Sequence, residues 1–443
     1  MATWCIKCHD SSPPVKTSTP TAFVPVSILW PTAPITINAS GYNKEVFKQS
    51  THYTKAGMQC NNCHENHGSG SYNLWLYGED TATGGICIRC HKGTDPAYPT
   101  AKNILADLQK GTSNNYRHPT LDVTAGTKHN NKENFQNRPL TERHAECSDC
   151  HDPHSEVPNP PGTTAPAVPG PLKNISGVGV AYGTTPWSLA ATYTFKSKID
   201  NAYEICLKCH SYYSYGNTPP QPGTTNTVFD GRAQTDPSIE FNPNNAGYHA
   251  VIGESKAHTQ HGAYVGTDRW GNPWTSTTRM YCEDCHGSDD LTRQGPHGST
   301  NKFILKRPYK PTTTTEATNG TGADADSATH LCFLCHDRQV YGGGADTYGV
   351  TKTGFSGGGR NLHNFGPSKH AGRSCNACHS MVVHGSRLPH LLIDARYDPF
   401  PYNNNGKNQF NGFTGTYDQN IINTINSKTG KWTQSDCTHA TCG

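Results

Sequence analysis

Eight copies of the pattern Cys-X-X-Cys-His run through the chain and account for sixteen of its eighteen cysteines. Two thiols at this spacing can add to the two vinyl groups of one porphyrin, while the adjacent imidazole binds the iron from one face. One copy could arise by chance, but eight predict eight covalently attached haem c groups. The expected attachment residues are Cys5, Cys8, Cys60, Cys63, Cys87, Cys90, Cys147, Cys150, Cys206, Cys209, Cys282, Cys285, Cys332, Cys335, Cys375 and Cys378.

The histidine that ends each motif is the expected first iron ligand. These histidines are His9, His64, His91, His151, His210, His286, His336 and His379. The chain has 24 histidines but only four methionines, so histidine is also the expected ligand on the opposite face. Coordination by two histidines predicts low-potential iron with no open position.

The motifs alternate between two classes. The first, third, fifth and seventh have an apolar second residue, and the other four have a polar one. A histidine followed by serine, usually with glycine between, comes after each polar motif, and we call these His-Gly-Ser elements: His67, His154, His297 and His384. His67 and His154 come three residues after a motif histidine, too close to pass around the same porphyrin. We therefore expect this group to bind the iron of a neighbouring haem.

A second group of histidines precedes the polar motifs and is expected to complete the coordination. The best-matched set is His52, His118, His249 and His363. A rival set lies nearer the polar motifs, at His144, His261 or His258, and His370, and the count of histidines does not separate the two sets. The remaining His129, His330, His390 and His439 are expected to bind propionates or face the solvent.

The composition indicates that the polypeptide alone cannot form a large core. Only 33% of the 443 residues are hydrophobic, and the chain contains 44 glycines and 31 prolines. We expect mostly irregular coil with short helices wrapped around eight haems, and an apoprotein that is unfolded. Short helices are predicted over residues 103–110 and 200–210, and a strand over 22–30.

The repeats suggest one elongated unit followed by a tail. The predicted octahaem unit covers residues 1–402, with repeats starting near residues 60, 147, 282 and 375. Residues 403–443 are rich in Asn and Gly and contain Cys437 and Cys442, which are expected to form a disulfide in an oxidising compartment.

Charge and hydropathy exclude two classes of partner. The apo chain has a formal charge of +3, and haem propionates are expected to make the holoprotein acidic. No basic run indicates nucleic acid, and no apolar run approaches the ~20 residues that span a bilayer. Covalent haem attachment takes place outside the inner membrane. We therefore expect an exported chain, with its signal peptide removed, in the periplasm or outside the cell.

The paired motifs, written CSDCHDPHS and then YEICLKCH, resemble the doubled Cys-X-X-Cys-His units of multihaem cytochromes in metal-reducing bacteria. Segments such as YHAVIGE and CNACHSMVVHGS look like the large secreted members of that group. Some of these polymerise into filaments called cytochrome nanowires, and in several a histidine of one subunit ligates a haem of the next. The resemblance covers Cys60 to about Leu392. It implies other copies of the chain, or other multihaem cytochromes, as partners.

The expected function is extracellular electron transfer through stacked haems to a metal oxide, an electrode or another cell. A filament is favoured over a discrete carrier because residues 10–51 contain no histidine, which leaves the first haem exposed at one end. A reductase of nitrite, hydroxylamine or a sulfur oxyanion needs one five-coordinate iron, often with lysine in place of the motif histidine. All eight motifs here end in histidine. Zinc sites would need four protein ligands each, which the alternation does not supply.

Overall fold

Regular secondary structure is sparse. The computed structural model describes residues 44–65, 85–110, 116–120, 145–215, 227–229, 232–233, 236–256, 262–269, 271–309, 329–342, 345–364, 375 and 378–393. The longest helix in these ranges, α7, has eight residues. Mostly irregular coil with a few short helices and little sheet was expected from the composition and is confirmed.

The α-helices are single or double turns. They are α2 (Lys44–Gln49), α3 (Thr51–Thr54), α4 (Ile86–Cys90), α5 (Leu105–Leu108), α6 (Cys147–Cys150), α7 (Tyr203–His210), α8 (Pro237–Glu240) and α10 (Arg338–Tyr341). The 3-10 turns are η1 (Cys60–Asn62), η3 (Gly170–Leu172), η4 (Tyr212–Tyr215), η5 (Cys282–Asp284), η6 (Lys302–Ile304), η7 (Leu331–Leu334) and η10 (Pro389–Leu391). Helices α5 and α7 fall within the two predicted segments, whereas the predicted strand at 22–30 lies outside the described residues.

Four two-stranded antiparallel pairs complete the described structure. They are β1 (Gly177–Ala181) with β2 (Thr192–Lys196), β3 (Thr227–Phe229) with β4 (Arg232–Ala233), β5 (Gly247–Tyr248) with β8 (Gly385–Ser386), and β6 (Ser356–Gly357) with β7 (Arg360–Asn361). The β5–β8 pair joins distant parts of the chain, with Gly247 opposite Ser386 and Tyr248 opposite Gly385. It places the segment before His249 beside the segment after His384.

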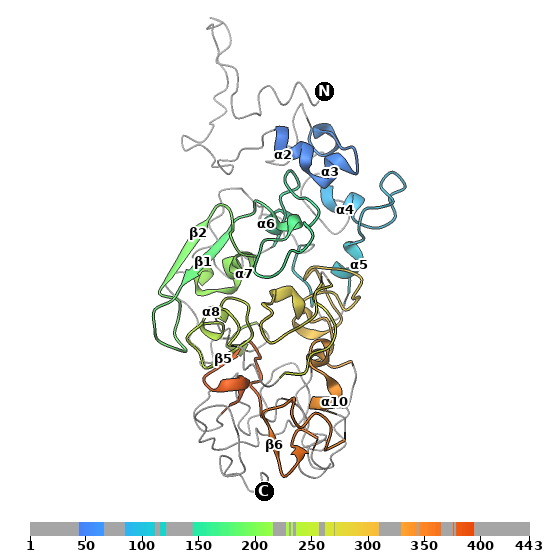
Figure 1. Cartoon of the computed structure of the whole chain (residues 1–443). Coiled ribbons are helices and arrows are strands. Elements are labelled where there is room, and N and C mark those ends of the chain that lie inside the picture. Colours follow the sequence, from blue (N-terminus) through green and yellow to red (C-terminus); the bar gives the residue numbers. More distant parts are fainter. Residues whose placement is uncertain are drawn as a thin grey trace, which may run out of the picture.

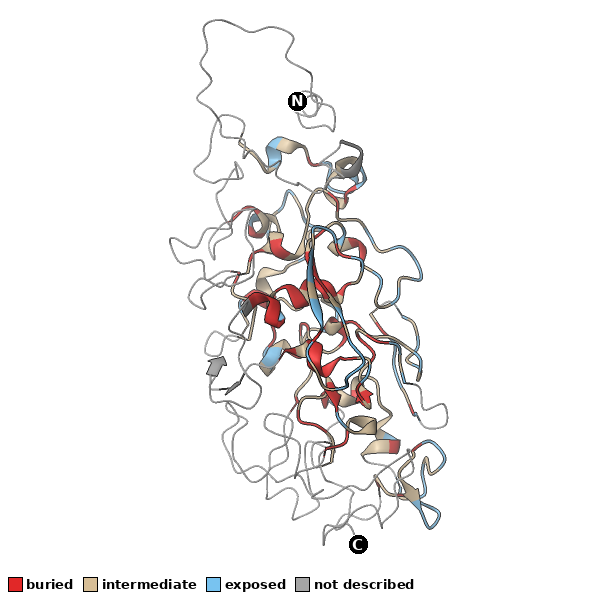
Figure 2. Ribbon diagram, turned by 90° about the vertical axis from the view of Figure 1, so that its left-hand side faces the viewer, coloured by how far each residue is buried: buried red, intermediate tan, exposed pale blue. Residues whose placement is uncertain are grey.

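The apolar core is divided into small clusters, each built around two or three buried side chains. Ile175, Ile199 and Ile205 form one, with Cys150 and Cys206 packed against it. Leu305, Tyr309 and Leu331 form another, bordered by Cys285 and Cys332. Figure 2 shows that the buried residues lie along the middle of the body. The clusters therefore lie beside attachment cysteines, as expected where the chain itself has too little apolar material for one large core.

The described elements follow one another along an elongated body. In Figure 1, α2 and α3 lie at one end, α6, α7 and α8 in the middle, and α10 and β6 toward the other end. The order in space thus largely follows the order in sequence. Among the described residues, no helix has both the length and the apolar character needed to cross a bilayer.

Candidate haem sites

Seven of the eight motifs fall wholly or partly within the described residues, and in six of them the same local bond orders the motif. The backbone N–H of the motif histidine donates to the carbonyl of the first cysteine at 2.9 Å in the motifs that end at His64, His91, His151, His286, His336 and His379. Positions i, i+3 and i+4 of such a turn share one face. One helical turn therefore brings both sulfurs and the imidazole to the same side.

The fourteen described attachment cysteines form no disulfide. They are Cys60, Cys63, Cys87, Cys90, Cys147, Cys150, Cys206, Cys209, Cys282, Cys285, Cys332, Cys335, Cys375 and Cys378. Several expected site residues lie outside the described residues: Cys5, Cys8, His9, His67, the rival ligands His144, His258, His261 and His370, and the tail cysteines Cys437 and Cys442.

Five motif histidines each face a histidine from a distant part of the chain. The ring centroids are 6.0 Å apart for His64 and His154, 6.3 Å for His91 and His52, 6.2 Å for His151 and His297, 6.2 Å for His210 and His118, and 6.0 Å for His286 and His384. The interplanar angles range from 4° to 88°, so ring stacking does not explain the common distance.

The common distance fits one metal ion between each pair. Imidazole nitrogens bind first-row metals at about 2 Å, which puts the centroids of two opposed imidazoles roughly 6.3 Å apart. Rings that pack by contact alone spread over centroid distances of about 4.5–7 Å, whereas these five pairs all lie at 6.0–6.3 Å. The residues present therefore fit an iron held between two histidines at each of the five places.

Backbone carbonyls select the tautomer of five of these ten histidines, and also of His249 and His379. Nδ1 lies beside a carbonyl oxygen in His52 (Pro153, 3.1 Å), His91 (Lys102, 3.0 Å), His118 (Pro296, 2.7 Å), His151 (Pro171, 3.0 Å), His249 (Val383, 2.5 Å), His286 (Phe303, 2.8 Å) and His379 (His390, 2.8 Å). A carbonyl oxygen can only accept, so Nδ1 carries the proton and donates it. The lone pair of Nε2 is then available to a metal, as in other metal-binding histidines.

Burial keeps several of these imidazoles neutral. Together with the smaller effect of charge on a neighbouring histidine, it lowers the pKa of His297 to about 3 and the pKa of His286 and His336 to about 4. For His336 the neighbours are His249 and His379. Neutral imidazole is the form that binds metal.

Two complete His-Gly-Ser elements lie within the described residues, and the same contacts explain why glycine and serine follow the histidine in both. A Cβ on Gly298 would overlap the carbonyl oxygen of Asp107, and a Cβ on Gly385 would overlap that of Glu240. Each serine donates to a carbonyl six residues later, Ser299 to Leu305 at 2.7 Å and Ser386 to Leu392 at 2.6 Å. Each also accepts from the backbone N–H two residues later, at 2.9 Å. The element thus fixes the backbone that follows the histidine.

Replacing Gly298 by alanine should lower the free energy of unfolding by at least ~2 kcal/mol, because backbone must move to admit the methyl group. Denaturant unfolding measures the loss. Gly183→Ala is the matched control, since a Cβ there meets nothing within 4 Å, and it should leave the midpoint unchanged. Equal stability of the two variants would contradict this account of the glycine.

Two turns of the same kind, which the sequence did not single out, each supply one of the carbonyl acceptors. Phe303 and Ile304 have φ of 62° and 55°, and His390 and Leu391 both have φ of 58°. The carbonyl of the first residue in each pair accepts from a motif histidine, His286 or His379. The segments HGSTNKFIL and HGSRLPHLL share the spacing from histidine to this turn, and that spacing is the signal that could have revealed it.

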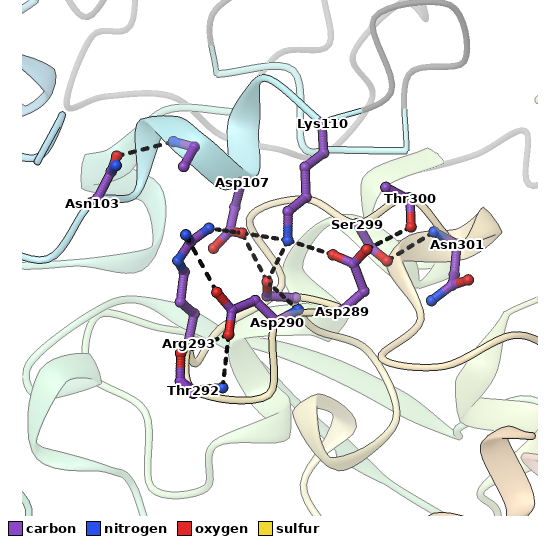
Figure 3. A network of polar contacts seen from close by, with 12 residues as sticks. Asn103, Asp107, Lys110, Asp289, Asp290, Thr292, Arg293, Ser299, Thr300 and Asn301 are labelled. Carbon is purple, nitrogen blue, oxygen red and sulfur yellow. Dashed lines mark hydrogen bonds and ion pairs between the residues drawn. The ribbon is translucent and has the colours of Figure 1, made fainter. Parts of the chain in front are cut away.

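A polar network fixes the loop that leads to His297 (Figure 3). Asp107 in α5 is fully buried, and its Oδ1 lies 2.8 Å from Arg293 Nη1 and 2.9 Å from Lys110 Nζ. Ser288 Oγ donates to the same oxygen at 2.8 Å, and Lys110 also forms an ion pair with Asp289. The network therefore joins the segment after the third motif to the segment after the sixth.

Histidines of the two ligand groups are hydrogen-bonded to each other's segments. The backbone N–H of His118 donates to the carbonyl of His297 at 3.2 Å, and that of His249 donates to the carbonyl of His384 at 3.0 Å. His52 makes the related contact through its side chain, to Pro153 beside His154. Histidines that face different motifs are thus held next to each other.

Attachment cysteines of successive motifs are also neighbours. The neighbouring Cys282 raises the pKa of Cys206, and the neighbouring Cys375 raises the pKa of Cys332. Charge on Cys90 raises the pKa of Cys63, after the larger effect of burial. The sulfurs of Cys332 and Cys375, with a ring nitrogen of His330, lie within 4.8 Å of one another. Consecutive motifs therefore approach one another from the second to the third, the fifth to the sixth and the seventh to the eighth.

Two histidines have surroundings of another kind. His363 has its Nδ1 3.1 Å from Thr353 Oγ1 and its ring 5.2 Å from those of Tyr341 and Phe355. His330 was expected to bind a propionate or face the solvent, but it is only 3% exposed. Its Nδ1 accepts from the backbone N–H of Cys332 at 3.3 Å, so it caps η7, a role that the sequence analysis missed.

The comparisons with known proteins agree with the motif chemistry. A family model described as Doubled CXXCH motif matches residues 52–96, which include His52 and the second and third motifs. No match was found among the curated proteins or among the solved structures. The match supports a multihaem c-type cytochrome, with covalently bound haem and a role in electron transfer, as the class to which this protein is similar.

Proposed function

We propose that this protein transfers electrons outside the cell through a continuous series of eight haem c groups, each bound by two histidines, as a subunit of a filament that delivers electrons to external acceptors. Bound haem c supplies one-electron exchange between ferric and ferrous iron, and the chain supplies binding, spacing and insulation. The observation that carries the proposal is the set of histidine pairs at 6.0–6.3 Å, each joining a motif to a distant segment.

The ligand pairs in this proposal are His64 with His154, His91 with His52, His151 with His297, His210 with His118, and His286 with His384. His336 takes His249, the neighbouring histidine that most lowers the pKa of His336. These pairs follow one rule. Each His-Gly-Ser histidine serves the polar motif one unit earlier in the chain, and each histidine of the second group serves the next apolar motif.

Continuity comes from two kinds of junction that alternate along the body. Each repeat unit holds two irons, and the distal ligands of those two irons are held together. His118 and His297, which face the two motifs of one unit, are hydrogen-bonded, and so are His249 and His384, which face the two motifs of the next. Between units, the attachment cysteines meet, as Cys206 meets Cys282 and Cys332 meets Cys375. Both arrangements favour short steps between successive iron sites.

The filament part of the proposal follows from the pairing rule at the chain ends. By this rule, His363 would bind the iron of an apolar motif after the eighth, and His67 would bind the iron of a polar motif before the second. The chain contains neither motif. The rule also leaves the irons of the first and eighth motifs with one histidine each. A second copy placed end to end would resolve both, with His363 of one copy serving the first motif of the next and His67 returning to the eighth.

Two measurements on purified holoprotein test the function. A pyridine haemochrome assay should give eight haems per chain, and electron paramagnetic resonance should show only low-spin ferric iron. Fewer haems would overturn the octahaem assignment. A high-spin signal in the wild type would favour a reductase with an open iron position.

Negative-stain microscopy tests the filament. The wild type should form long thin fibres, and His363→Ala should give isolated particles because the junction loses an iron ligand. His129→Ala, which alters a histidine without an assigned ligand role, should leave the fibres intact. Isolated wild-type particles would select a discrete carrier instead.

A further inference from the structure

The three described histidines of the His-Gly-Ser elements differ in what their Nδ1 atoms face. His384 Nδ1 lies 2.5 Å from Glu240 Oε2. His154 Nδ1 lies 3.4 Å from Asp152 Oδ1, and that carboxylate is 17% exposed. His297 Nδ1 is buried and has no hydrogen-bond partner among the described residues. The pairing at His384 is therefore the shortest and the most shielded from solvent.

Glu240 is held firmly in this position. Its side chain is fully buried at the end of α8. Asp236 caps the start of the helix, where its side chain accepts from the backbone N–H of Ser238 at 2.7 Å, and Asn245 Nδ2 donates to the Glu240 carbonyl at 2.8 Å. The ring of Phe241 packs on His384 with centroids 4.8 Å apart, which fixes the imidazole as well.

A buried carboxylate has a stronger effect on a metal ligand than a carbonyl has. It accepts the Nδ1 proton and carries a negative charge that the interior screens little. Both effects increase the electron density at Nε2 and make the imidazole a stronger donor to the metal. A stronger donor and a nearby negative charge stabilise ferric over ferrous iron and so lower the reduction potential.

We propose that Glu240, acting through His384, gives the haem attached at Cys282 and Cys285 the lowest potential among the sites whose ligand pairs the structure describes. On the opposite face, His286 donates to the neutral carbonyl of Phe303, so the difference comes from the distal side. The inference rests on the proposed ligand pairs, and it makes Glu240 a positioning and tuning residue for electron flow.

The test is a spectroelectrochemical titration of wild-type and Glu240→Gln holoprotein. Glutamine keeps the shape and an acceptor oxygen but removes the charge. One redox transition, the lowest among the sites with described ligand pairs, should move to a higher potential. Its equilibrium constant should change by a factor of at least about ten, or 59 mV for one electron. The g values of one low-spin resonance signal should shift at the same time. The other seven transitions should stay in place.

Asp152→Asn is the matched control, because that carboxylate is farther from its histidine and partly exposed. It should move its transition by less than Glu240→Gln does. If Glu240→Gln retains eight low-spin haems and no transition moves, the inference is wrong. If that variant fails to fold, Glu240→Asp replaces it. The shorter side chain withdraws the carboxylate from His384 Nδ1 but keeps the charge, so a smaller upward shift is expected, and an unshifted transition there contradicts the inference. Haem count and spin state test the ligand pairs separately.

Discussion

Replacing Cys206 and Cys209 together by alanine should remove one haem from the middle of the molecule and unfold the region around it. Helix α7 carries both cysteines, with Cys206 beside the cluster of Ile175, Ile199 and Ile205. These clusters are small, so the porphyrin must supply much of the apolar surface that holds them together. The loss should be on the order of 5 kcal/mol or more, comparable with the whole stability of a domain.

Three readouts report this effect. The haemochrome assay should fall from eight haems to seven, limited proteolysis should cut near α7, and electron transfer from one end to the other should fall by orders of magnitude. Cys437→Ala with Cys442→Ala is the matched control, because these cysteines belong to no attachment motif, and it should keep eight haems. A variant with wild-type haem content, stability and conduction would refute the central role of this site.

Replacing His297 by alanine should leave one iron in eight with a single histidine. The partner ring in the structure is His151, with centroids 6.2 Å apart. Alanine removes the imidazole and leaves a space of that size beside the iron site, so the iron should become high-spin or bind water. The absorbance and resonance spectra should show one high-spin site that binds carbon monoxide when reduced. Conduction should fall by at least about tenfold, since the potential and the spin state of one step both change.

Two further observations separate loss of a ligand from loss of structure. Added imidazole should restore the low-spin spectrum of the His297→Ala protein, which a merely unfolded site would not allow. His390→Asn is the control, because asparagine tolerates the φ of 58° and keeps the carbonyl that accepts from His379. It should remain fully low-spin. A wholly low-spin spectrum for His297→Ala would mean that another residue is the ligand of that iron.

The behaviour expected of His154 followed from its place in the sequence. Its position three residues after His151 predicted that it would serve a neighbouring haem, because so short a segment cannot pass around the porphyrin. In the structure its ring lies 6.0 Å from that of His64. The rule behind the prediction is local and steric, so the sequence alone could supply it, and the ligand role of His154 stays a prediction. Which neighbour it would face was not predictable, because that depends on how distant segments fold together.

His118 shows the opposite case. Its place in the repeat made it one of two possible choices, with His144 as its rival, and nothing in the spacing separated them. The structure sets His118 beside the Pro296 carbonyl and opposite His210. His144 lies outside the described residues. Glu240 and the turns at Phe303 and His390 were likewise not foreseen, because an acid on a short helix and a backbone carbonyl have no chemical signature until another segment approaches.

The sequence by itself determined the attachment chemistry, the supply of histidine ligands and the scarcity of regular structure, since thioether spacing and composition are properties of the local chain. Tertiary structure alone decided which histidine faces which, the order in which motifs approach one another, and the one distal histidine that meets a fully buried carboxylate. Those features depend on contacts between segments far apart in the chain, such as β5 with β8, and no local pattern specifies such contacts.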